Sequence, residues 1–146
     1  MNIRQMTRAT LASVILAASG LVGAAELTPG LWEMTVKLDS PAVPENMRTQ
    51  VRDHCLTQKQ ASNPEMAMRE SWKAENCNNS EISRSGDTLQ WSANCKMPGS
   101  KTTTKIRGEM VIHNDKHYSS NITISGNNHS MTTHSEAKWK GQCPGQ

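Results

Sequence analysis

The chain has 146 residues, of which 35% are hydrophobic and 3% aromatic, and it contains no Phe. Arg4 and Arg8 lie in an N-terminal leader, and removing them from the 16 basic side chains leaves 14, against 13 acidic ones. Because the remaining chain is nearly neutral and no basic cluster stands out, a nucleic-acid-binding or membrane-surface protein is excluded. The small number of large apolar side chains predicts a small domain that is stabilised by disulfides.

The first 25 residues are typical of a secretory signal peptide. Arg4 and Arg8 form its basic region, residues 9–22 an uncharged apolar region, and residues 23–25 a small-residue cleavage site. The apolar run is short and rich in Ala and Ser, whereas a membrane-spanning helix needs about 20 apolar residues. We therefore expect a signal peptide over residues 1–25 and one periplasmic or secreted domain over residues 26–146 that does not span the membrane.

The clearest strand is predicted within residues 26–38, where apolar and polar side chains alternate with a period of two. One face of this strand carries Trp32, Met34, Val36 and Leu38. Prolines at positions 41 and 44 end it, and residues 45–54 favour a second strand that leads into Cys55. Residues 57–68, which include Pro64, are expected to form a loop with room for one short helix.

The stretch from Cys77 to Cys95 predicts a β-hairpin. A turn centred on Gly86 sets Cys77 opposite Cys95, at a position where a disulfide can form.

Four cysteines allow three pairings, and we favour Cys77–Cys95 together with Cys55–Cys143. In the chain-entropy model these bridges stabilise the fold by about 3 and 4.5 kcal/mol. Terms of that size rival the whole net stability of a small domain.

Further strands in a meander are predicted from Trp72 onwards, with turns at residues 98–99, 114–116 and 127–128. The expected registers set the following residues opposite each other: Trp91 and Gly108, Ile106 and Ile124, Gly108 and Ile122, Ile112 and Tyr118, Ile124 and Met131, Tyr118 and Ala137. These registers keep one apolar face continuous. We therefore predict an all-β fold, a curved antiparallel β-meander of six or seven strands, either an open sheet or a small barrel.

Several short motifs together resemble a known family. They are Gly30 and Trp32, the Cys-Leu-Thr run at residues 55–57, the pair Cys77 and Cys95 with Trp91 between them, and Gly141 with Cys143. In order and spacing they resemble the bacterial envelope family known as domain of unknown function 3617, over nearly the whole mature chain. The resemblance implies a secreted or periplasmic β-rich domain with two disulfides. It implies no activity and no functional residues, and the His- and Met-rich second half is not expected of that family.

A metal site is one hypothesis for the polar face. His113 and His117 are expected to lie opposite each other across the turn at residues 114–116, with Glu109 and His134 nearby and Asn121 between them. Two imidazoles and a carboxylate can hold zinc or copper. Since the spacing fixes no third ligand, we favour a solvated hairpin end and assign no metal.

Copper(I) is a second metal hypothesis, because methionine thioethers are soft ligands. The Met residues at positions 34, 110 and 131 fall on core faces and are expected to fill space there. Met66 and Met68, with Met47 upstream, form the remaining candidate cluster. We expect no resident cofactor.

The chain contains none of the motifs G-x-S-x-G and H-E-x-x-H and no phosphate-binding glycine loop. No serine or cysteine nucleophile has a base and an orienting group fixed by spacing, so we expect a protein that is not an enzyme. Trp32, Trp91 and Tyr118 either form the core or line a small apolar pocket. The favoured function is an exported envelope structural or binding module, whose partner is an envelope protein or a small apolar ligand; the alternative is periplasmic copper or zinc handling through His and Met.

Overall fold

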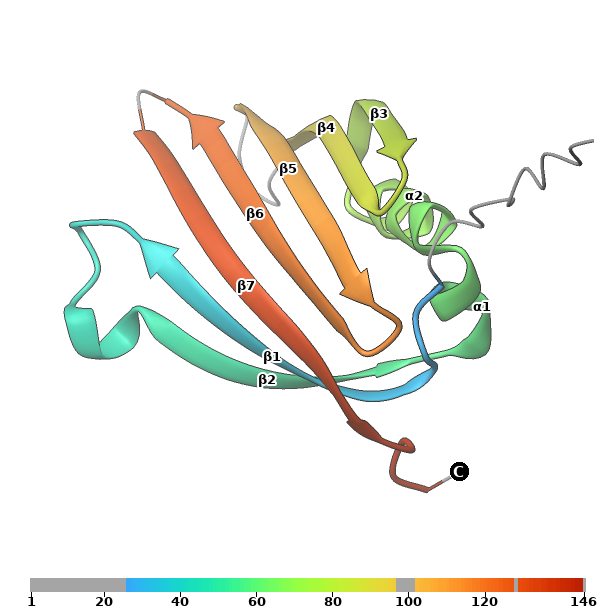
Figure 1. The fold of residues 1–146 in the computed structure, drawn as a ribbon. Helices are drawn as coiled ribbons and strands as arrows, with labels where there is room; N and C mark the ends of the chain where they lie inside the picture. Colours follow the sequence, from blue (N-terminus) through green and yellow to red (C-terminus); the bar gives the residue numbers. More distant parts are fainter. Residues whose placement is uncertain (1–25, 97–101, 128, 146) are drawn as a thin grey trace, which may run out of the picture.

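A computed structural model describes residues 26–96, 102–127 and 129–145 (Figure 1). The leader at 1–25, the turn at 98–99 and Asn128 lie outside these ranges. The elements are β1 (Gly30–Asp39), η1 (Glu45–Met47), β2 (Thr49–Leu56), α1 (Gln58–Ser62), α2 (Pro64–Ala74), β3 (Cys77–Ser85), β4 (Thr88–Lys96), β5 (Thr103–Asn114), β6 (His117–Gly126) and β7 (His129–Gly141). The predicted all-β class is confirmed as an open antiparallel sheet.

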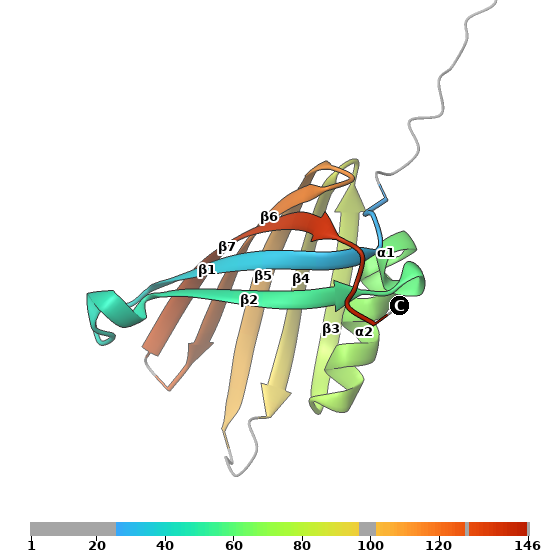
Figure 2. The ribbon, with the colours of Figure 1, turned by 90° about the horizontal axis from the view of Figure 1, so that it is seen from below.

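The sheet contains seven strands in the order β2-β1-β7-β6-β5-β4-β3. Strands β3 to β7 form the predicted meander. The sheet continues past β7 in a way that the sequence did not reveal: β1 pairs with β7, and β2 pairs with the other side of β1. The sheet coils strongly, so that β1 and β2 cross in front of β3, β4 and β5 when the molecule is seen from below (Figure 2).

The β3–β4 hairpin reaches the predicted cysteine pairing by an unpredicted route. Next to the turn, Ser85 faces Thr88, so the turn is the two-residue Gly86-Asp87 rather than a turn centred on Gly86. A β-bulge between Asn78 and Glu81 adds one residue to β3. Because the bulge shifts the register by one residue, Cys77 still comes to lie opposite Cys95.

The registers predicted for the apolar positions are confirmed, but the expected placement of His113 directly opposite His117 is wrong, because a register shift after Ile112 pairs His117 with Asn114. Across β4, β5, β6 and β7 the paired residues include Trp91 with Gly108, Ile106 with Ile124, Gly108 with Ile122, Ile112 with Tyr118, Ile124 with Met131 and Tyr118 with Ala137. Since directly paired residues share a face of the sheet, one face is apolar across these strands. The buried core lies on this face, where Trp32, Leu89 and Ile112 are its largest fully buried side chains.

The segment after Cys55, expected to be a loop with room for one short helix, contains two helices, α1 and α2. Thr57 caps α1 through a capping box with Gln60, and the Asn63 side chain accepts from the Met66 N–H at the start of α2. Pro64, which we took as a sign of a loop, occupies the first turn of α2, where its missing N–H costs nothing. Trp72 belongs to α2 and packs into the core, so the strand expected from Trp72 begins only at Cys77.

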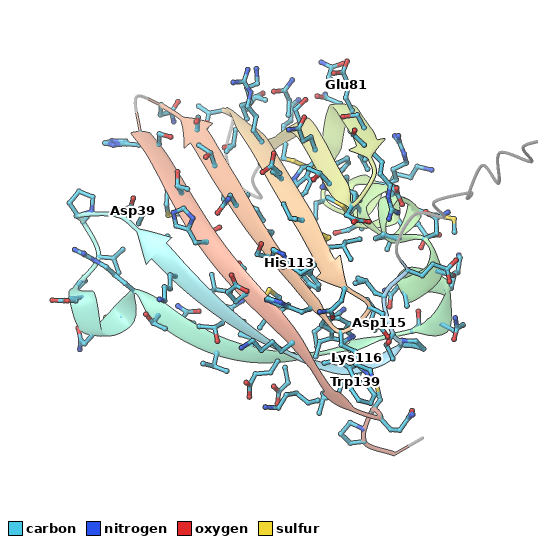
Figure 3. The ribbon with its side chains drawn as sticks, in the orientation of Figure 1. Asp39, Glu81, His113, Asp115, Lys116 and Trp139 are labelled. Carbon is cyan, nitrogen blue, oxygen red and sulfur yellow. A yellow bond between two sulfur atoms is a disulfide. The ribbon has the colours of Figure 1, made fainter. Side chains whose placement is uncertain are left out.

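The N-terminal segment is fastened to the β5–β6 turn. The Thr28 backbone N–H donates to the Asp115 carbonyl at 2.7 Å, and the Thr28 hydroxyl donates to the Asp115 carboxylate at 2.9 Å. The Lys116 ammonium lies 4.8 Å from the ring centroid of Trp139 at the end of β7 (Figure 3). These contacts hold together the start of β1, the β5–β6 turn and the end of β7. Within the described ranges, no helix has the length and apolar character to cross a membrane.

Candidate binding surface

Each edge strand of the sheet carries a disulfide. Cys55 in β2 is bonded to Cys143, which follows β7, and Cys77 in β3 is bonded to Cys95 in β4. Both predicted pairings are therefore present. The first bridge spans 88 residues of sequence and the second 18, so together they fasten both borders of the sheet to its interior.

The three aromatic residues proposed to line an apolar pocket lie on the apolar face. Trp32 is 1% exposed and donates its indole N–H to the Thr28 carbonyl at 2.9 Å. Its ring centroid lies 5.3 Å from that of Tyr118, and burial raises the pKa of the Tyr118 phenol. Trp91 is 8% exposed and its ring covers Gly108. All three side chains belong to the packed core or its border.

A large hollow lies on the opposite, polar side of the sheet. It has a volume of about 840 Å³ and extends over β3, β4, β5 and β6, with Arg69 of α2 at its rim. Register places most of its lining residues on the polar face, namely Glu81, Ser83, Gln90, Ser92, Arg107, Glu109, Asn121 and Thr123. Ile82, Trp91 and Gly108, which pair with one another on the apolar face, also line it. Glu81, near the top of Figure 3, marks the β3 end of this polar hollow.

The charges of the polar hollow balance. Arg69 and Arg107 contribute two positive charges, and Glu81 and Glu109 two negative ones. Glu109 accepts a hydrogen bond from the Gln90 amide at 2.8 Å. Within the described chain, the side chains of Arg69, Glu81 and Arg107 are not engaged in a hydrogen bond or ion pair with the protein. The surface therefore offers both donors and acceptors to a ligand, without a net charge that would select an anion or a cation.

Of the histidines proposed as metal ligands, His134 contacts Asn121, which lines the polar hollow. The rings of His113 and His117 stack with their centroids 4.5 Å apart. His117 Nε2 lies 2.6 Å from the Glu136 carboxylate, and His134 Nδ1 lies 2.6 Å from the Asn121 side-chain oxygen. Each ring thus has a neighbour other than a metal. Over residues 26–96, 102–127 and 129–145, the structure brings together no group of three or more His, Cys, Asp or Glu side chains suited to hold a metal ion.

Ser119 contacts His113, a pairing that resembles the first two members of a nucleophilic triad. His113 Nε2 lies 2.8 Å from the Ser119 hydroxyl. A triad also needs an acid that orients the base, but the nearby carboxylate, Glu136, contacts His117 instead. Because the two imidazoles stack rather than share a hydrogen bond, Glu136 does not orient His113. The arrangement therefore lacks the connected serine, histidine and acid that nucleophilic catalysis uses.

The methionines proposed as a copper(I) cluster, which all lie in the described ranges, do not gather into one site: η1, which carries Met47, lies at the other end of the sheet from α2 (Figure 1). Met68 packs against the core from α2, and Met66 is half-buried on the same helix. Met47 lies in η1 and is 60% exposed. Met34 and Met110 pack against the core, as expected from the alternation of their strands.

Sequence reasoning missed the polar hollow and most of the residues that line it, although it placed Glu109 and Asn121 together on the polar face. Their signal was present, since Gln90, Arg107, Glu109 and Asn121 occupy the polar positions of alternating strands. The alternation of polar and apolar residues shows which face of the sheet is polar, but it does not show that this face contains a hollow. Arg69 could not have been grouped with these residues, because no helix was predicted over residues 64–74, where it lies.

One comparison with known proteins gave a match. A family model described as "Protein of unknown function (DUF3617)" matches residues 27–143. No curated protein and no solved structure matches the chain.

Proposed function

Since the chain belongs to the DUF3617 family, whose function is unknown, we propose that it is an exported, non-enzymatic binding module of the bacterial envelope. We further propose that it binds a glycan, a ligand rich in hydroxyl and amide groups, in the polar hollow. The polar hollow itself is the observation that carries this proposal. An apolar ligand is less suited to it, because ten of its thirteen lining residues are polar or charged and Trp91, which also lines it, is largely buried in the core.

Export is supported by the disulfides and the leader. Structural disulfides persist in oxidising compartments and are rare in the cytosol. Here both borders of the sheet depend on one, so the reducing cytosol would loosen both. The basic and apolar regions of residues 1–25 have the order of a signal peptide.

Glycan binding is supported by the chemistry of the polar hollow. Sugar hydroxyls both donate and accept hydrogen bonds, and the lining supplies amides, hydroxyls, carboxylates and guanidinium groups. Arg107 and Glu109 come from the same strand and point into the hollow two residues apart. A hollow of about 840 Å³ falls within the usual size of small-molecule sites, roughly 300–1,000 Å³.

A binding role is favoured over catalysis because the Ser119–His113 pair lacks an orienting acid. Metal handling gains no support from the described part of the chain, where no suitable ligand group is found.

Titration of the oxidised mature protein with a tetramer of β-1,4-linked N-acetylglucosamine, followed by NMR, tests the proposal. We expect shifts confined to amides of β3 to β6 around the hollow. Arg107→Ala should weaken binding by about tenfold or more, since a hydrogen bond to a charged group contributes about 1.5–3 kcal/mol. Lys138→Ala, an exposed cation on β7 outside the hollow, is the matched control. Shifts scattered over the surface, or equal affinity in Arg107→Ala and the wild type, would contradict it.

A further inference from the structure

The two edges of the sheet differ in how they are protected. The β3 edge is interrupted by the bulge between Asn78 and Glu81 and has α2 packed beside it. The β2 edge pairs with β1 through eight consecutive residue pairs without a register shift. Regular, uncovered edge strands offer unpaired backbone groups to another strand. The β2 edge is therefore open to strand addition, whereas the β3 edge is blunted.

Exposed apolar side chains gather at the same edge. Among the described residues, the exposed large hydrophobic side chains are Met47, at 60%, and Val51, at 62%. Val51 lies in β2, and Met47 ends η1 immediately before it. Every residue of β2 except Leu56 is exposed. The apolar side chain of Val51 would lose contact with water if another strand paired with this edge, which favours association there.

The outward-facing backbone groups of β2 can be identified from one hydrogen bond. The Leu38 N–H donates to the Arg48 carbonyl at 2.8 Å, so these two residues form a hydrogen-bonded pair. In an antiparallel ladder such pairs alternate along the strand. The even-numbered residues of β2 therefore direct their N–H and C=O groups to β1. Thr49, Val51, Asp53 and Cys55 direct theirs outward.

We propose that the β2 edge is a dimer interface, in which β2 of a second copy of the chain pairs with it in antiparallel orientation. Val51 faces its own counterpart on the twofold axis. Thr49 then faces Asp53 of the second copy, and Gln50 faces Arg52. The outward N–H and C=O groups of Thr49, Val51 and Asp53 are satisfied, and the exposed Val51 side chains cover each other.

Avoidance of like-charge pairs favours this register over those centred on Gln50, Arg52 and Asp53. In a symmetric antiparallel pair, the twofold axis passes through one residue of β2, and residues equally far from it on either side face each other. Each alternative register therefore corresponds to moving the axis to another residue of β2. An axis at Arg52 sets two guanidinium groups opposite each other, and one at Asp53 sets two carboxylates opposite each other. An axis at Gln50 brings Arg52 opposite Arg48. Like charges directly opposite destabilise a sheet, whereas the axis at Val51 creates no such pair.

Each copy has one open edge, so the pairing closes after two chains. The interface is isologous, and the two blunted β3 edges remain at the ends of the combined sheet. The partner is thus a second copy of this chain, and higher assemblies are not expected. This inference is independent of ligand binding in the polar hollow.

Sedimentation of the oxidised mature protein at concentrations up to about 1 mM tests the interface. We expect a monomer–dimer equilibrium. Val51→Lys places two ammonium groups on the axis and removes the apolar contact, so dimerisation should weaken by at least about tenfold. Ser85→Lys adds the same charge at an exposed position of the blunted edge strand β3 and should leave dimerisation unchanged. A monomer throughout, or a dimer that Val51→Lys leaves intact, would overturn the proposal.

Two further measurements test the register. Thr49→Lys gives each Asp53 a cation across the axis, and two such pairs should tighten the dimer by about 2- to 30-fold. Amide hydrogen exchange at Thr49, Val51 and Asp53 should slow as protein concentration rises, while exchange at Arg52, whose N–H faces β1, stays the same. Dimerisation with fast, concentration-independent exchange at all three positions would show that copies associate elsewhere and would refute the inference.

Discussion

Gly108→Ala should destabilise the protein although it adds only one methyl group to a strand. A Cβ at position 108 would overlap the indole of Trp91, which lies directly over the glycine. Alanine alone would favour a strand by about 0.5–1 kcal/mol relative to glycine. Overpacking a core by one group costs about 1–3 kcal/mol. Since the Trp91 ring is 8% exposed and packed in the core, it has little room to move, and we expect a net loss of about 1–2 kcal/mol.

Urea unfolding of the oxidised protein, followed by tryptophan fluorescence, measures this loss. Gly126→Ala is the matched control, because a Cβ there would meet the Thr104 hydroxyl at 3.4 Å, an ordinary contact. The control should be neutral or slightly stabilising. In the background Trp91→Phe the smaller ring should reduce the cost of Gly108→Ala, giving a coupling free energy of at least about 0.5 kcal/mol. If Gly108→Ala is as stable as Gly126→Ala, the placement of Trp91 over Gly108 is refuted.

Two other predictions concern stability. Replacing both cysteines of a bridge by alanine should cost about 3 kcal/mol for Cys77–Cys95 and about 4.5 kcal/mol for Cys55–Cys143, from loop lengths in the chain-entropy model; urea midpoints that rank the two variants in the opposite order would contradict this. Burial raises the pKa of Tyr118 from 10.0, so above pH 10 the unfolded state loses this proton more readily than the folded state. The stability that this difference provides is present below pH 10 and is lost as the pH rises through the folded-state pKa. Urea unfolding at pH 9 and pH 11 should therefore show a smaller fall in stability for Tyr118→Phe than for the wild type, and equal falls would refute the assignment.

Local pairings were predictable because short turns fix the register of neighbouring strands. The apolar alternation in β5 and β6 left one register that puts Ile112 opposite Tyr118, and the structure has it. The pairing of β1 with β7 was not predictable in this way, because the two strands lie about a hundred residues apart and no turn relates them. The β3 bulge was hidden for a different reason. A single extra residue reverses the phase of the alternation, but β3 carries only Cys77 and Ile82 as apolar residues to show that change.

In the candidate site, too, what short turns determine was predictable and what depends on the wider fold was not. The predicted turn brings His113 and His117 close together, with ring centroids 4.5 Å apart, although the register shift after Ile112 pairs His117 with Asn114 rather than with His113. The contact of His113 with Ser119 depends on side-chain direction, which alternation does not give. The polar hollow depends on how the sheet coils and on a helix that Pro64 led us to take for a loop. Pro64 shows that a proline directly after a capping Asn can mark the start of a helix rather than a loop that ends one.

Peptide mapping of the protein recovered from the periplasm, without reduction, tests the central claim most directly. An exported sheet with both borders held by disulfides should give an N-terminus at Glu26 and two linked peptides, one joining Cys55 to Cys143 and the other Cys77 to Cys95. Free thiols, a peptide joining Cys55 to Cys77, or a retained leader would contradict it.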